Sequence, residues 1–231
     1  RETRLLRMAQ QTAREVKQPI TGILWTAEKM NALLETIKNP ETREKFRQLS
    51  RFLTEDAHTL ERQSHNILRL FQLQEPVYSP FDLKEFLETR ANRYADSLKL
   101  RDKIQMRLHI QQPIPLRSDP ELLNEALVIL WDNAVDAMPR GGKLSLSAVP
   151  VAPTAPGRPG HVLIEVQDTG CGIPDDMLPH IFEPFYSGKK TGTGIGLTIC
   201  QQIIHALDGT IEIYSRKDFG TKIAISIKML P

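Results

Sequence analysis

Cysteine and long apolar runs are scarce in this sequence of 231 residues. The two cysteines, Cys171 and Cys200, are too few for a disulfide framework and indicate a reducing compartment. The longest uninterrupted apolar run, Ala126 to Trp131, is far too short to span a bilayer. A formal net charge of +2 gives no reason to expect a nucleic acid or a membrane surface as a partner.

The remaining composition is that of an ordinary globular protein. Apolar residues make up 40% and charged residues 25% of the chain, and its length suffices for one large or two ordinary domains. The sequence starts at Arg1 rather than Met and shows no signal peptide. We therefore expect a fragment of a longer protein, whose sensor or membrane segment lies elsewhere.

The first part of the chain predicts two long helices. Apolar residues follow an unbroken three-four spacing over residues 6–37, which is typical of a helix packed along a coiled-coil-like seam. Asn39-Pro40 interrupts this pattern, and comparable spacing over residues 46–71 predicts a second helix. Because an isolated hairpin cannot bury both apolar stripes, we expect residues 1–75 to form an antiparallel helical hairpin that dimerises into a four-helix bundle.

A second, mixed domain is predicted after a short linker. Pro76 and Pro80 forbid a helix over residues 76–80, and residues 81–231 read as one α+β sandwich. A Pro/Gly-rich stretch over residues 150–160 predicts a non-catalytic hairpin loop, and Ser118-Asp119-Pro120 predicts a helix cap. We expect helices at about 83–98, 120–138 and 194–207, and strands at about 104–108, 143–149, 161–167, 210–215 and 222–227.

Two glycine-containing motifs carry the strongest functional signal. Residues 168–174 read Asp-Thr-Gly-Cys-Gly-Ile-Pro, in which a strand ends in a carboxylate and two glycines let the backbone approach a flat group. Residues 192–197 read Gly-Thr-Gly-Ile-Gly-Leu and open a helix, where backbone N–H groups point at an anion. Asn133 upstream and Phe182-Glu183-Pro184-Phe185 between the motifs make the combination more specific than either motif alone.

Together these motifs resemble the nucleotide-binding boxes of sensor histidine kinases, which belong to the gyrase, Hsp90, histidine kinase and MutL ATP-binding group. The resemblance implies that residues 81–231 form an α/β-sandwich catalytic domain that binds ATP or ADP with Mg²⁺. It also implies that residues 1–75 form a dimerisation and histidine-phosphotransfer-like hairpin. The short stretch before the second motif resembles the ATP lid of the nitrogen-regulator and oxygen-sensor subgroups.

The resemblance implies a role for each matching residue. Asp168 would accept a hydrogen bond from the exocyclic amine of adenine, beside Gly170 and Gly172, although an Asp-Thr-Gly turn also ends many strands. Asn133 would coordinate the Mg²⁺ that bridges the phosphates, with Asp136 one turn away, although an Asn can also satisfy a backbone group. The other expected ATP-binding residues surround the phosphates: Lys189, Lys190, Gly192, Thr193, Gly194, Gly196 and Leu197. For either lysine, simple solvation is an equal alternative.

The residue one turn before Asn133 bears on whether the site can hydrolyse ATP. ATP-hydrolysing relatives carry a Glu there that activates water, whereas this chain has Ile129, which can be neither a base nor a ligand. That argues against an ATPase of the gyrase type. Histidine kinases usually carry Asn at this position, so Ile129 also departs from that family and argues against tight Mg²⁺ binding.

Residues 13–20 resemble the phospho-acceptor box of these kinases, with Arg14 in place of the acceptor His. A neutral imidazole offers a lone pair to the γ-phosphoryl group, whereas a guanidinium stays protonated and is no nucleophile. Glu15, the general base of the family, then has no useful proton to remove. Gln18 lies one turn after Arg14, where family members place an amide or hydroxyl that orients water. We therefore expect a kinase core that is defective in autophosphorylation, a pseudokinase.

Several explanations of Arg14 stay open at this point. The chain is a naturally degenerate kinase, a variant of an active kinase, a phosphatase of a response regulator, or a non-catalytic dimeric scaffold. The resemblance implies a homodimer, a response-regulator receiver domain or a partner kinase, and an upstream sensor domain. It also implies a cytoplasmic location, or the stromal or cytosolic face in an organelle, with any membrane anchor outside this chain.

Overall fold

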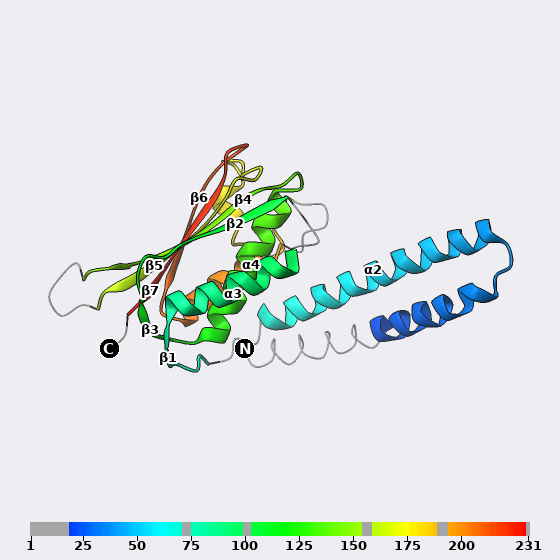
Figure 1. Ribbon diagram of the computed structural model, residues 1–231, viewed down its shortest axis with the longest axis horizontal. Helices are drawn as coiled ribbons and strands as arrows, with labels where there is room; N and C mark the ends of the chain where they lie inside the picture. The colour runs from blue at the N-terminus through cyan, green and yellow to red at the C-terminus, as the bar shows by residue number, and fades with distance from the viewer. Residues whose placement is uncertain (1–18, 71–74, 99–102, 154–158, 189–193, 230–231) are drawn as a thin grey trace. The chain divides into compact units, whose positions relative to one another are not determined.

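The computed structural model describes residues 19–70, 75–98, 103–153, 159–188 and 194–229 (Figure 1). It divides the chain into two compact units, Arg1–Gln72 and Leu73–Pro231. Each unit is described by itself below.

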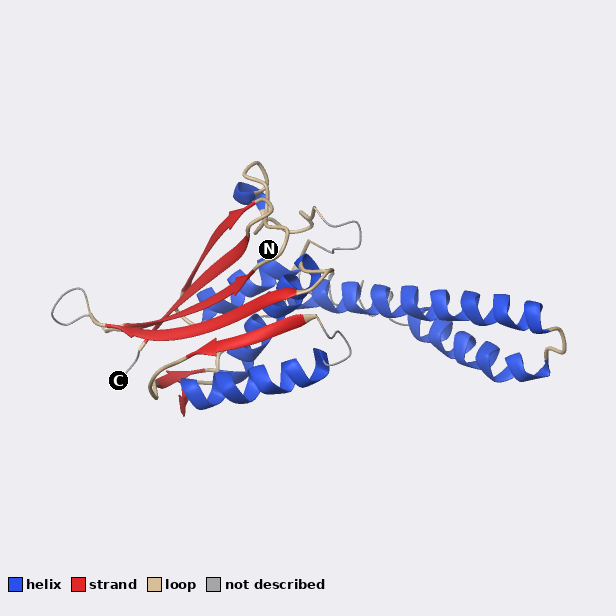
Figure 2. Cartoon of the chain, turned by 45° about the horizontal axis from the view of Figure 1, so that its top comes forward, coloured by secondary structure: helices blue, strands red, loops and turns tan. Residues whose placement is uncertain are grey.

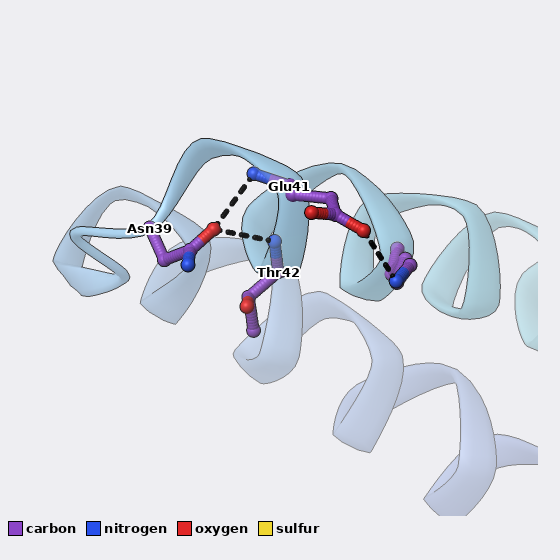
Figure 3. Close-up of polar contacts among 4 residues, drawn as sticks. Asn39, Glu41 and Thr42 are labelled. Atoms are coloured by element: carbon purple, nitrogen blue, oxygen red, sulfur yellow. Dashed lines mark hydrogen bonds and ion pairs between the residues drawn. The ribbon is translucent and has the colours of Figure 1, made fainter.

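The N-terminal unit is a helical hairpin. A helix covers residues 19–33, the 3₁₀ turn η1 covers Leu34–Thr36, and α2 covers Pro40–Leu70. The side-chain oxygen of Asn39 accepts from the backbone N–H groups of Glu41 (2.9 Å) and Thr42 (3.1 Å), which caps the first turn of α2 (Figure 3). The predicted break at Asn39-Pro40 is thereby confirmed, and proline occupies the helix position that tolerates it best.

The two helices of this unit meet through different kinds of side chain. The first helix and η1 contribute the predicted seam, of which Ile20, Ala27 and Leu34 are buried. The buried α2 residues that meet it are small: Ser50 donates to the carbonyl of Ala27 (3.2 Å), and Ala57 is buried as well. Of the apolar stripe predicted on α2, Ala57 is thus buried, whereas Phe46, Leu49, Leu53 and Leu60 are exposed. One hairpin therefore leaves apolar surface uncovered, as the sequence predicts.

The C-terminal unit contains three α-helices and seven strands within its described residues. The helices are α3 (Leu83–Leu98), α4 (Pro120–Ala137) and α5 (Gly196–Ala206), with the 3₁₀ turn η2 at Leu178–His180. The strands are β1 (Ser79–Asp82), β2 (Ile104–His109), β3 (Pro115–Ser118), β4 (Gly142–Val151), β5 (His161–Asp168), β6 (Thr210–Arg216) and β7 (Gly220–Lys228).

Five of these strands form one sheet in the order β2-β4-β5-β7-β6, with β2 parallel to β4 and the other neighbours antiparallel. Helices α3, α4 and α5 cover one face of this sheet (Figure 2). Alternating side chains of β4, β5 and β7, such as Leu146, Ile164 and Ile225, are buried against them. The C-terminal unit is thus the predicted two-layer α/β sandwich.

The predicted helices and strands of this unit are present, with three corrections. The residues predicted as a linker extend into β1, which pairs with the equally unpredicted β3 in a two-stranded sheet. Pro80 is tolerated there because both strands of such a sheet are edges. The loop expected from residue 150 begins later, since Pro150 and Val151 still pair with β5. Pro150 lies beyond the last residue of β4 that pairs with β2, so no ladder bond needs its missing N–H.

Candidate functional site

Asp168 ends β5 as a buried carboxylate, with 6% of its surface exposed. Its Oδ1 atom accepts from the backbone N–H of Gly170 (2.7 Å) and of Thr221 (3.3 Å). Bonds from two backbone N–H groups to a charged acceptor are strong and directional. They fix the orientation of this carboxylate at the end of the sheet.

Glycines allow the chain to pack closely around Asp168. A Cβ atom on Gly170 would lie 2.7 Å from the Cβ of Ala137, and one on Gly220 would lie 2.2 Å from the carbonyl oxygen of Asp168. Gly172 has a φ of +65°, and a Cβ there would lie 2.1 Å from the carbonyl oxygen of Arg216. The protein itself fills the space that these glycines leave, a packing role that the motif did not reveal.

The loop after Asp168 is held by three neighbouring segments. The N–H of Cys171 donates to the carbonyl of Ala137 at the end of α4 (3.1 Å). The carbonyl of Cys171 accepts from the N–H of Asp218 in the β6–β7 turn (2.7 Å). The hydroxyl of Thr169 accepts from the N–H of Lys143 on β4 (3.0 Å). These hydrogen bonds tie the loop to α4, β4 and the β6–β7 turn.

Ser215 is a member of this site that the sequence reading missed. It stands opposite Thr221 in the β6–β7 register, and their hydroxyl oxygens are 2.8 Å apart. Ser215 also accepts from the N–H of Ile173 (2.8 Å) and lies 3.0 Å from the carbonyl oxygen of Gly220. The sequence did contain a signal for it. Along β6, every second residue faces the core, and Ser215 follows Ile211 and Ile213 in that series.

The second glycine motif lies against α4. A Cβ on Gly196, the first residue of α5, would lie 3.4 Å from Cγ2 of Ile129 and 4.0 Å from Nδ2 of Asn133. Asn133 is half-buried, whereas Asp136, one turn further, is exposed. The structure therefore brings Asn133 and Ile129 to the start of α5.

The start of α5 has backbone groups that its own side chains do not cap. Ile195 occupies the N-cap position and its side chain makes no capping hydrogen bond. Gly194, with a φ of +66°, packs so closely that a Cβ would lie 2.5 Å from the carbonyl carbon of Phe185. Half-buried Leu197 follows in the first turn. A helix start of this kind suits an anionic group.

The aromatic motif between the glycine motifs is tied to α5. Thr198, a second residue missed in the sequence, donates its hydroxyl hydrogen to the carbonyl of Phe182 (2.9 Å). The N–H of Phe185 donates to the carbonyl of Gly194 (2.9 Å), and the Phe185 ring itself is exposed. The Phe-Glu-Pro-Phe segment thus braces the turn that leads into α5.

Some predicted site residues lie outside the residues that the structure describes. They are Arg14, Glu15 and Gln18 in the first segment, and Lys189, Lys190, Gly192 and Thr193 before α5. Their assigned roles stay predictions.

The two cysteines differ sharply in their surroundings. Cys171 is an exposed free thiol in the loop after Asp168. Cys200 is buried in α5, where its thiol lies 3.8 Å from the carbonyl oxygen of Ala126 on α4. Burial, and secondarily the charge of Glu125, raises the pKa of the Cys200 thiol to about 12. Cys200 is therefore a packing residue that stays neutral.

Residues 118–231 match the family model described as "Histidine kinase-, DNA gyrase B-, and HSP90-like ATPase". These residues form a domain of that family. The match starts at Ser118, so β1, α3 and β2 precede the matched part of the C-terminal unit. Among the described residues, no helix is both long and apolar enough to cross a membrane.

Similar proteins extend over more of the chain than the ATPase-family domain. Sporulation kinase D of Bacillus subtilis (strain 168) is 26% identical over 230 residues, which are 95% of this chain and 41% of that protein. The chain therefore spans about two fifths of the length of this relative.

Two solved structures share the fold. Full-length ShkA in complex with AMPPNP has a TM-score of 0.73 at 23% identity, covering 96% of this chain and 45% of ShkA. Histidine kinase ThkA in complex with response regulator protein TrrA has a TM-score of 0.67 at 22% identity, covering 97% of this chain and 62% of that one.

Proposed function

We propose that this chain is the kinase core of a sensor histidine kinase and that its ATPase-family domain binds ATP or ADP with Mg²⁺. The observation that carries the proposal is the buried carboxylate of Asp168, which the N–H groups of Gly170 and Thr221 hold in one orientation. A fixed carboxylate in a buried corner suits the exocyclic amine of adenine. The AMPPNP complex of ShkA supports the same assignment.

The phosphates would bind at the start of α5. Its first turn offers backbone N–H groups without a capping side chain from Ile195. Asn133 lies beside Gly196 and would be the protein ligand of Mg²⁺, with phosphate and water oxygens completing the coordination. When bound, Mg²⁺ would neutralise charge on the phosphates. The described residues contain no cluster of three His, Cys, Asp or Glu side chains suited to a metal.

Titration calorimetry of the whole chain with Mg²⁺-AMPPNP tests this assignment. Asp168→Asn can present a donor where the adenine amine needs an acceptor, at a cost of about 1–3 kcal/mol, or roughly a 5- to 150-fold loss of affinity. Asp208→Asn is the matched control, because Asp208 is exposed beyond the far end of α5. Equal affinity of Asp168→Asn and the parent chain would show that the base site is misassigned.

We also propose that the hairpin forms a homodimer. The support is the exposed apolar stripe on α2, in which Leu49 is 59% and Leu60 is 44% exposed. Trp25 in the first helix and Leu33 at the end of that helix are exposed as well. A second copy of the hairpin would cover these surfaces in a four-helix bundle.

The expected signalling partner is the receiver domain of a response regulator, or a partner kinase. The ThkA–TrrA complex supports the first choice, because ThkA shares the fold of both units. We place the chain in the cytoplasm, in agreement with two cysteines that are both free thiols.

The chain as written is proposed not to phosphorylate itself at position 14. Arg14 carries no lone pair for a phosphoryl group, and Glu15 beside it has no imidazole proton to remove. Conformational signalling by a degenerate kinase is the function that this substitution favours. A variant of an active kinase, a response-regulator phosphatase and a dimeric scaffold are the alternatives that the phosphorylation experiment below separates.

A further inference from the structure

Strand β6 lies at one edge of the five-stranded sheet. β7 pairs with one side of β6 along its whole length, and in the described part of the chain no strand pairs with the other side. Proteins usually protect such an edge with a proline, a lysine, a bulge or a very short strand. β6 has seven residues and contains neither proline nor lysine. Its outer side is therefore open to pairing with another strand.

The direction of the backbone groups on β6 follows from one hydrogen bond of its neighbour. The N–H of Thr221 on β7 donates to Asp168 on β5, so the backbone groups of Thr221 point away from β6. Ser215 lies opposite Thr221, and two opposite residues of an antiparallel pair either face each other or both face away. Ser215 therefore points its N–H and C=O to the free side of β6. Ile213, two residues earlier, does the same.

The exposed side chains of β6 carry opposite charges on either side of a tyrosine. Glu212, Tyr214 and Arg216 alternate along the face of the sheet opposite the helices, and all three are exposed (Figure 2). The hydroxyl of Tyr214 donates to Glu212, and the guanidinium of Arg216 lies 4.4 Å from the centre of the Phe219 ring. Because the two charges are two residues from Tyr214 in opposite directions, the strand is complementary to itself under a two-fold rotation about Tyr214.

We propose that β6 pairs antiparallel with β6 of a second copy of this chain, about a two-fold axis at Tyr214. In this register Glu212 of each copy lies directly opposite Arg216 of the other, and the two Tyr214 rings are neighbours. The outward N–H and C=O groups of Ile213 exchange hydrogen bonds with those of Ser215 in the second copy. The pairing thus satisfies backbone groups and charges together.

Neighbouring registers are less favourable. An axis at Glu212 would set two carboxylates opposite each other, and like charges in opposite positions destabilise a sheet. An axis at Ile213 would place Arg216 opposite Thr210 and Glu212 opposite Tyr214, so neither charge would have an oppositely charged residue across from it. Of these three axes, only the one at Tyr214 gives two pairs of opposite charge.

The contact is small. Residues 212–216 of each strand take part, far fewer than the roughly 20–30 residues a side of a stable interface, so we expect a dissociation constant of roughly hundreds of micromolar or weaker. In a homodimer of hairpins each subunit would carry one β6 edge. The pairing would then join one dimer to the next where the protein is concentrated, and it does not depend on nucleotide binding.

Sedimentation of the whole Leu49→Glu chain at roughly 0.1–1 mM measures this contact without the hairpin contact. Glu212→Arg sets arginine opposite arginine, and Arg216→Glu sets carboxylate opposite carboxylate, so each should weaken association roughly tenfold. A mixture of these two variants should recover association, and so should one chain that carries both changes, because opposite charges face each other again. Glu88→Arg makes the same charge change at an exposed position on α3 and should have no effect.

Amide hydrogen exchange of the parent chain tests the ladder itself. The N–H groups of Ile213 and Ser215 should exchange more slowly at roughly 1 mM than at roughly 10 µM. Those of Glu212 and Tyr214 point to β7 and should exchange alike at both concentrations.

Three outcomes would overturn the inference. They are unchanged exchange at Ile213 and Ser215, undiminished association of the Glu212→Arg chain, and a mixture of the two charge variants that fails to recover association. A parent chain that is monomeric at roughly tens of micromolar, yet shows the slower exchange at high concentration, would remove the hairpin dimer and leave this inference standing.

Discussion

The carboxylate of Asp119 joins the start of α4 to Val77, 42 residues earlier in the chain. Its Oδ1 accepts from the N–H groups of Glu121 (2.9 Å) and Leu122 (3.0 Å), and its Oδ2 accepts from the N–H of Val77 (2.8 Å). Asp119 is 7% exposed, so water cannot easily replace these bonds. One side chain thus caps the helix that carries Asn133 and fastens the segment that enters this unit.

Asp119→Ala should destabilise the C-terminal unit by about 2–4 kcal/mol, from a lost helix cap and buried N–H groups left without acceptors. Chemical denaturation of the whole chain, followed by the fluorescence of buried Trp131, measures the change. Asp119→Asn keeps one acceptor and should fall between the parent and the alanine variant. Asp175→Ala at an exposed position is the control. A loss no larger than that of the control would contradict the capping role.

The Arg14 hypothesis predicts no acid-labile, alkali-stable label when the chain is incubated with Mg²⁺ and γ-labelled ATP. Arg14→His restores an imidazole beside Glu15 and should acquire label if the nucleotide domain is competent. Asp168→Asn in the same background should abolish that label. Label on the parent chain would show that another residue is the acceptor. Failure of Arg14→His to label while AMPPNP still binds would make Ile129 the next residue to test.

The dimer proposal predicts that Leu49→Glu shifts the chain toward the monomer in sedimentation at tens of micromolar, roughly the range where a weak bundle still associates. A charge buried in an apolar interface lacks a partner and is costly. Gln48→Glu adds the same charge one residue away, on an exposed face outside the stripe, and should leave association unchanged. A monomeric parent chain would contradict the proposal.

The two thiols should react very differently. Ellman's reagent at pH 8 should modify Cys171 in the folded chain and reach Cys200 only after unfolding, because burial raises the Cys200 pKa to about 12 and shields its sulfur. Absorbance of the released dye gives the number of reacted thiols, and Cys171→Ser should leave none in the folded chain. Rapid reaction in folded Cys171→Ser would show that α5 opens from α4.

The capped N-termini of α2 and α4 could be predicted from the sequence. Asn39-Pro40 and Asp119-Pro120 each combine a capping side chain with a proline, and α2 and α4 start at those prolines. The strands β1 and β3 were not predicted, because each has only four residues and one of the four is proline. Only their mutual pairing, which is not local in the chain, makes them strands.

The candidate site was predicted less completely, because its contacts join distant segments. Asp168 could be named from its motif, but Ser215 acquires a role only when β7 places Thr221 between them. Thr198 is similar, since its hydroxyl meets a carbonyl 16 residues earlier. Ser50 on α2 was also missed, because a serine does not read as a core residue until a neighbouring helix covers it, whereas Ala57 belonged to the predicted apolar spacing.

The position of β7 between β5 and β6 sets the order in which the corner around Asp168 can form. The N–H that orients Asp168 belongs to Thr221, and the turn that clamps Cys171 belongs to the β6–β7 hairpin. During synthesis from the N-terminus, residues 118–200 can emerge complete and still lack this corner. A nascent chain therefore gains the hydrogen bond from Thr221 to Asp168 only after β7 has been released and inserted into the sheet.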